Sequence, residues 1–147
     1  MNSYLQMKER HSHEFEEFPI FFAFDNKQFA DGMKSLGLDP AETDKIYTLP
    51  GTGGFYRKSD AQWLRDIFDQ HDKEFQEAID ADPTGEGFVF DMFSYELSNH
   101  EFGITGTVSD TLDALGLTEE EVRANPKLKH GLALALEEQK EGASVNW

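Results

Sequence analysis

Residues 18–29 read FPIFFAFDNKQF and join a predicted strand to the start of a helix. Five consecutive apolar residues, from Ile20 to Phe24, predict a strand buried on both faces. Pro19 ends the helix expected before the strand, because the residue before a proline avoids helical geometry. Asp25 and Gln28 have the spacing of a capping box, which predicts that a new helix begins directly after the strand.

A β-hairpin supplies the rest of the expected sheet. Residues 45–49 and 55–57 have strand-like sequences, and the residues between them, PGTGG, are rich in turn formers. The glycines, followed by Arg57 and Lys58, also suggest a phosphate-binding loop. That motif needs Gly-Lys-Ser/Thr leading into a helix, whereas these glycines lead into a strand. We therefore expect an antiparallel sheet made of a strand at about 20–24 and a hairpin at about 45–57.

The rest of the chain has the apolar spacing and the capping residues of helices. The predicted helices cover about 3–17, 26–36, 60–81, 109–115, 118–124 and 126–141. Residues 88–102 fit two structures, since Phe-Val-Phe suits a strand whereas Val89, Phe93 and Leu97 have helical spacing; we favour a helix. The predicted class is α+β, a mainly helical single domain over residues 1–141 with a frayed tail at 142–147.

The charge balance is the most unusual bulk property of the sequence. The chain has 29 acidic and 13 basic residues, a formal net charge of −16 over 147 residues. Such a surface repels nucleic acids and anionic membranes and attracts basic protein surfaces. We expect a basic protein partner, with no direct nucleic-acid or membrane contact. A sharper hypothesis is a DNA mimic, whose carboxylates imitate phosphates and block a nucleic-acid-binding protein.

Several classes of protein are disfavoured by what the sequence lacks. The absence of cysteine excludes disulfides, thiolate metal sites and cysteine nucleophiles, and it favours a cytoplasmic location. Residues 1–17 lack the apolar segment of a signal peptide, and no apolar run approaches the ~20 residues of a membrane span. No nucleophile motif is present, so we assign no catalytic residue and no cofactor. The oligomeric state is left open.

One stretch matches the oxygen ligands of a calcium-binding loop. Asp80, Asp82, Thr84 and Asp91 fall on ligand positions 1, 3, 5 and 12 of an EF-hand, and Gly85 falls on the turn position 6. Pro83 and Gly87 depart from the pattern, and Asp91 is shorter than the usual glutamate. An acidic turn between two helices is the competing interpretation.

The histidines provide a second metal hypothesis. His71, Glu96 and His100 could form a transition-metal site if their helices pack together, since Glu96 and His100 share a helix face at i, i+4 spacing. On the first helix, His11 and His13 point in different directions at i, i+2 spacing. Solvated or capping histidines are the competing interpretation.

Five segments resemble an uncharacterised family of small acidic proteins of Firmicutes, their phages and mobile elements. They lie at 18–29, 44–47, 53–58, 91–101 and 110–117, and together they span most of the chain. The resemblance implies an intracellular accessory protein and brings no known activity or catalytic residue. We therefore expect a non-enzymatic protein that docks a basic partner, with a metal-binding module and a DNA mimic as the alternatives.

Overall fold

The computed structural model describes residues 2–100, 102 and 106–145, and it describes side chains as far as residue 141. The chain folds into two compact units, one made of Met1–Arg10 and Lys73–Trp147 and the other of His11–Asp72. The boundary falls within α1 (Ser3–Glu16) and within α3 (Ala61–Ala81). The predicted α+β class, mainly helical with a small antiparallel sheet, is confirmed; the extent of 1–141 stays a prediction.

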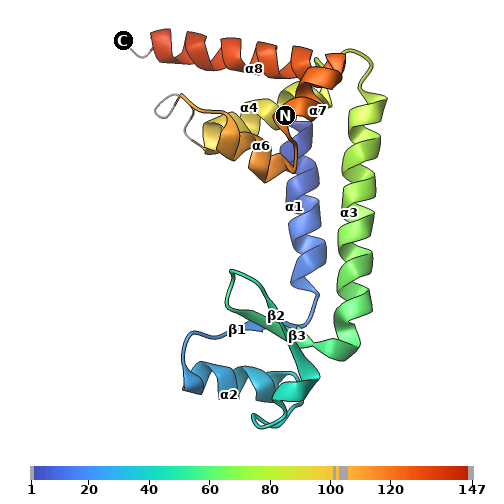
Figure 1. The fold of residues 1–147 in the computed structure, drawn as a ribbon, viewed down its shortest axis with the longest axis vertical. Coiled ribbons are helices and arrows are strands. Elements are labelled where there is room, and N and C mark those ends of the chain that lie inside the picture. Colours follow the sequence, from blue (N-terminus) through green and yellow to red (C-terminus); the bar gives the residue numbers. More distant parts are fainter. Residues whose placement is uncertain (1, 101, 103–105, 146–147) are drawn as a thin grey trace. The chain divides into compact units, whose positions relative to one another are not determined.

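The unit of residues 11–72 contains the sheet (Figure 1). Its strands are β1 (Ile20–Phe22), β2 (Ile46–Leu49) and β3 (Gly54–Arg57), antiparallel in the order β1-β3-β2. Two short 3₁₀ turns, Thr43–Lys45 and Lys58–Asp60, flank the hairpin. The antiparallel pairing of β2 with β3 supports the hairpin interpretation over a phosphate-binding loop, and Gly51 and Gly53 adopt positive φ angles in its turn, a conformation that glycine tolerates best.

One face of this sheet is covered by α2 (Asn26–Ser35). Phe21 from β1 packs with Met33 and Leu36 from the α2 segment, and Phe29, Ile46 and Phe55 are among the residues that complete this core. The expectation that Ile20 to Phe24 would be buried on both faces is wrong. The strand ends at Phe22, and Phe22 is 51% exposed because β1 is an edge strand covered by α2 on one side only.

The α2 helix begins where the sequence predicts it. Asp25 accepts a hydrogen bond from the Gln28 backbone N–H at 2.7 Å. The Gln28 side chain accepts from the Phe24 N–H, also at 2.7 Å, so the reciprocal bond reaches one residue further back than a standard capping box. The bond from Gln28 satisfies one of the backbone donors that a helix start leaves unpaired, and the bond from Phe24 ties the preceding residue to the first turn.

The other unit is helical. It contains α4 (Phe88–Asn99), α6 (Ser109–Leu115), α7 (Glu119–Ala124) and α8 (Pro126–Val145), together with residues 3–10 of α1 and residues 73–81 of α3. Val89, Met92, Phe93 and Leu97 of α4 are fully buried. The helical interpretation of residues 88–102 is thus confirmed for 88–99; residues 101 and 103–105 lie outside the described residues. The α8 helix extends to Val145, beyond the predicted end at 141, and residues 146 and 147 are not described.

Two backbones approach closely where α8 packs on α4. A Cβ atom built on Gly131 would lie 2.6 Å from Cγ1 of Val89 and 2.7 Å from the carbonyl oxygen of Gly85. A Cβ atom on Gly85 would lie 2.3 Å from the carbonyl oxygen of Lys127. Both positions therefore require glycine, because any side chain would force the helices apart.

Within the described residues, no helix combines the length and the apolar character that crossing a lipid bilayer requires.

Candidate functional sites

A shallow acidic groove lies between the start of α4 and the last turns of α8, within the helical unit. Its volume is about 360 Å³. Phe90 and Leu134, both half-buried, supply its apolar part. Four exposed glutamates complete the lining: Glu86, Glu137, Glu138 and Glu141. The groove thus combines apolar side chains with carboxylates.

The groove carries little compensating positive charge. Glu138 accepts a short hydrogen bond from the Ser94 hydroxyl, and Glu86 lies 3.3 Å from Nε2 of His130. Neither partner is a lysine or an arginine. Within the described part of the chain, none of the four glutamates forms an ion pair with a lysine or an arginine. The groove is therefore an anionic surface that favours a cationic ligand.

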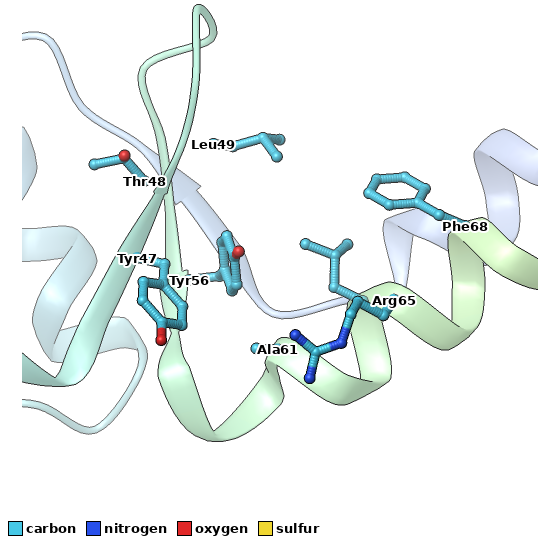
Figure 2. A pocket seen from close by; sticks show the side chains of 8 residues that line it. Tyr47, Thr48, Leu49, Tyr56, Ala61, Arg65 and Phe68 are labelled. Carbon is cyan, nitrogen blue, oxygen red and sulfur yellow. The ribbon is translucent and has the colours of Figure 1, made fainter.

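A second groove, in the unit of residues 11–72, has the opposite character (Figure 2). Its volume is about 400 Å³, and Tyr47, Tyr56 and Phe68 contribute aromatic rings to it. The Arg65 guanidinium lies on its rim and donates to the side chain of Gln62. Lys58 lies 5.0 Å from the centre of the Tyr47 ring. Cations at this aromatic groove make it unsuitable for a basic ligand.

The residues of the predicted calcium loop have separate structural partners. Asp80 accepts from the Gln76 side chain, and Asp91 accepts from both the backbone N–H and the hydroxyl of Ser3 at the start of α1. The hydroxyl oxygen of Thr84 accepts from the Glu86 N–H. Within the part of the chain that the structure describes, their carboxylates are not among the groups with three ligand atoms within 4.8 Å. Calcium binding stays a prediction that this arrangement does not favour.

Asp82 is the centre of that loop and is 6% exposed. Its two carboxylate oxygens accept four backbone N–H groups at 3.0–3.3 Å, from Thr84, Gly85, Gly87 and Val89. Burial raises the pKa of this carboxyl, but the four hydrogen bonds outweigh burial and hold the pKa below its ordinary value. Asp82 thus holds the loop in place and accepts a backbone N–H at the start of α4, and its role as a metal ligand stays a prediction.

The predicted set of His71, Glu96 and His100 is divided between the two units. Glu96 and His100 belong to α4 and its C-terminal end, whereas His71 belongs to the unit of residues 11–72. Glu96 is 1% exposed and lies 3.4 Å from Nζ of Lys8. His100 has a buried Nε2 that makes no hydrogen bond within the described residues. Neither Glu96 nor His100 lines either groove.

Glu96 also interacts with a tyrosine. Burial, followed by the charge and the hydrogen bond of Glu96, raises the pKa of Tyr4 well above its ordinary value. Lys8 lies over the rings of Tyr4 and Tyr95, 5.8 Å and 5.3 Å from their centres. The buried Glu96 carboxylate therefore has the Lys8 ammonium group and the Tyr4 phenol as partners within the core of the helical unit.

His71 instead belongs to a different cluster, with His11 and Glu14. One ligand atom from each of the three residues lies within 4.8 Å of the other two. Nε2 of His71 is 2.7 Å from a carboxylate oxygen of Glu14. The imidazole rings of His11 and His71 stack at 3.7 Å with an angle of 5° between them. All three residues belong to the unit of residues 11–72.

Sequence reasoning found His71 but assigned it other partners. One part of this cluster is visible in the sequence, because His11 and Glu14 are three residues apart and therefore share one face of α1. The contact that brings His71 of α3 to these two residues of α1 is not visible in the sequence, because no local pattern encodes the pairing of distant helices. The acidic groove was also missed, because glutamates near the end of a helix are usually solvated.

Comparison with known proteins identifies a family for this chain. A family model matches residues 3–138, nearly the whole chain, and its description is a family of unknown function, DUF7659. No curated protein matches the chain, and no solved structure does. The extent of the family match decides the assignment: the chain belongs to the family DUF7659.

Proposed function

We propose that this chain is a non-enzymatic docking protein whose groove between α4 and α8 binds a basic segment of a partner protein. The observation that carries the proposal is the placement of Glu86, Glu137, Glu138 and Glu141 around the apolar side chains of Phe90 and Leu134. A segment with an apolar anchor flanked by lysines or arginines matches both features. An amphipathic helix laid in a groove is a common form of such recognition.

Electrostatic attraction supports the proposal both at long range, through the net charge, and at short range, through the glutamates of the groove. The net charge of −16 speeds encounter with any basic protein, an effect that salt screens over about 8 Å at physiological ionic strength. The local glutamates then select where the ligand binds, since complementary charges across an interface fix its register. The apolar contacts to Phe90 and Leu134 supply affinity that salt does not remove.

A defined probe tests the groove directly. The probe is a fluorescent amphipathic peptide of lysines and leucines, titrated into the chain at 50 mM and 500 mM salt. We expect saturable binding that weakens at least tenfold at the higher salt. In ¹⁵N-labelled protein, the amides of Phe90, Leu134 and Glu137 should shift.

A pair of charge-matched variants separates the groove from the overall charge. The double variant Glu137→Gln, Glu141→Gln should weaken binding about tenfold. Glu119→Gln, Glu120→Gln on α7 removes the same charge elsewhere and should change affinity less than twofold. Equal losses in the two variants would show that binding is unspecific and would refute the groove.

The alternative hypothesis is that the chain imitates DNA and competes with DNA for a basic nucleic-acid-binding protein. If so, the chain should displace DNA from such a protein, and the Glu137→Gln, Glu141→Gln variant should displace it equally well. The bacterial or phage source and the cytoplasmic location stay predictions from the sequence. They agree with an accessory protein that meets its partner inside the cell.

A further inference from the structure

We propose that His11, Glu14 and His71 form a binding site for a divalent transition-metal ion, with Zn²⁺ as the ligand that fits best. Two imidazoles and one carboxylate are a donor set that zinc uses in proteins, with water in the remaining position. The site shares no residue with the α4–α8 groove and does not depend on the proposed function.

The geometry supplies three ligands from two helices. His11 and Glu14 are one helical turn apart on α1, and His71 comes from α3. Their ligand atoms already lie within 4.8 Å of one another, whereas atoms bound to one zinc ion at about 2.0–2.2 Å lie some 3–4 Å apart. Bringing the ligand atoms to that separation requires them to approach by about 1 Å.

The surroundings of the three residues suit an exchangeable ion. The His71 side chain is 15% exposed, so it is held in place, whereas that of Glu14 is 44% exposed and leaves one side open to water. The excess of 16 negative charges raises the local concentration of cations. Imidazole donors favour zinc, nickel, cobalt and copper over calcium and magnesium, which prefer oxygen ligands.

The other two histidine–glutamate pairs of the described chain provide matched controls. Nδ1 of His13 lies 3.4 Å from Glu16 on α1, and Nε2 of His130 lies 3.3 Å from Glu86. Each pair offers one imidazole and one carboxylate, and neither belongs to a group of three ligands. If a single histidine–glutamate pair were enough to bind zinc, the substitutions in the control pairs would reduce Zn²⁺ binding as much as those at the three-residue site.

The test uses the full chain without an affinity tag, in a buffer with 5 mM Mg²⁺ to saturate surface carboxylates. Isothermal titration with Zn²⁺ should show one saturable site, and Co²⁺ should give the visible absorption bands of a low-coordinate complex. Affinity should fall as the solution is made more acidic, because protons compete with the metal ion for its ligands. Circular dichroism confirms that each variant is folded.

His71→Gln and His11→Gln should each weaken Zn²⁺ binding at least tenfold and abolish the cobalt bands, and Glu14→Gln should weaken binding severalfold. His13→Gln and His130→Gln should leave both measurements unchanged. Two results would overturn the site: no saturable binding of Zn²⁺ up to 100 µM by the unaltered chain, or an equal loss in the control variants. If His71→Gln proves unfolded, the His11→Gln result decides, because His11 lies on the other helix.

Discussion

Replacing Asp82 by alanine is expected to cost the helical unit about 3 kcal/mol of stability. The carboxylate accepts four backbone hydrogen bonds, and those from Gly85 and Val89 are buried. A buried N–H left without a partner costs about 1–3 kcal/mol, whereas the more exposed donors of Thr84 and Gly87 can turn to water. Two unpaired buried donors at about 1.5 kcal/mol each give the total.

The substitution Asp82→Asn keeps the shape of the side chain and removes its charge. It keeps one acceptor oxygen, which can serve one pair of donors, and it presents an amide N–H₂ group to the other pair. We expect Asp82→Asn to lose about half of the alanine effect, or ~1.5 kcal/mol. The measurement is urea unfolding followed by circular dichroism at pH 7. Hydrogen exchange at the Gly85 and Val89 amides should accelerate in both variants.

The difference in stability between the unaltered chain and Asp82→Asn should become smaller at low pH. The pKa of Asp82 is lowered in the folded chain, so its contribution is fully present above the ordinary aspartate pKa of about 3.9. It is lost as the pH falls through the folded value. The stability gap between the unaltered chain and Asp82→Asn should stay constant from pH 5 to 8 and shrink below about pH 4.

Two outcomes would refute this account of Asp82. One is a loss below 1 kcal/mol for Asp82→Ala at pH 7, which would show that the four hydrogen bonds contribute little. The other is a rise in melting temperature with millimolar Ca²⁺ that Asp82→Asn abolishes. That result would restore the calcium-loop hypothesis, because a ligand that binds only the folded chain stabilises it.

Three further substitutions test the packing of the helical unit, each by urea unfolding. Gly131→Ala should destabilise by about 1–3 kcal/mol, because the clash with Val89 exceeds the ~1 kcal/mol gain in helix propensity; a stabilised variant would contradict the close approach. Lys8→Met should cost about 1–3 kcal/mol by leaving Glu96 buried without its cation, and no loss would mean that the remaining partners suffice. Thr118→Ala should cost ~1 kcal/mol, since Thr118 caps α7 by accepting from the Glu121 N–H; an unchanged midpoint would show that water replaces the cap.

Features fixed by local chemistry could be predicted from the sequence. Asp25 caps α2 as expected; Thr118 caps α7 in the same way, and Gly116 ends α6 in a left-handed conformation. These residues act on backbone groups within four positions of themselves, so neighbouring residues are enough to identify them. The hairpin was found for the same reason, because its turn residues lie between its two strands.

Features that depend on distant segments were harder to predict. The Phe-Val-Phe run at residues 88–90 fits a strand or a helix by itself, and the packing of α8 against Gly85 and Val89 explains the helix. The acidic loop matched a calcium site because a sequence pattern counts carboxylates but does not show what they bind. In the structure, the backbone N–H groups around Asp82 take both of its oxygens.

The candidate sites show the same limit. Glu14 lies three residues from His11, which is visible in the sequence, but His71 is 57 positions from Glu14. No periodicity reports that α1 and α3 bring these residues together. The α4–α8 groove likewise depends on which glutamates face Phe90, and composition alone gives only the total charge.

The discontinuous make-up of the helical unit has a consequence for synthesis on the ribosome. Residues 11–72 form a unit from one continuous stretch, which can fold as soon as it emerges. Tyr4, by contrast, packs against Phe75, Phe88 and Tyr95, which are translated some seventy to ninety residues later. Tyr4 must therefore lack these aromatic partners while residues 11–72 are synthesised. A nascent chain arrested after residue 72 should expose Tyr4 to solvent and to chaperones, and release of the remaining segment should bury it.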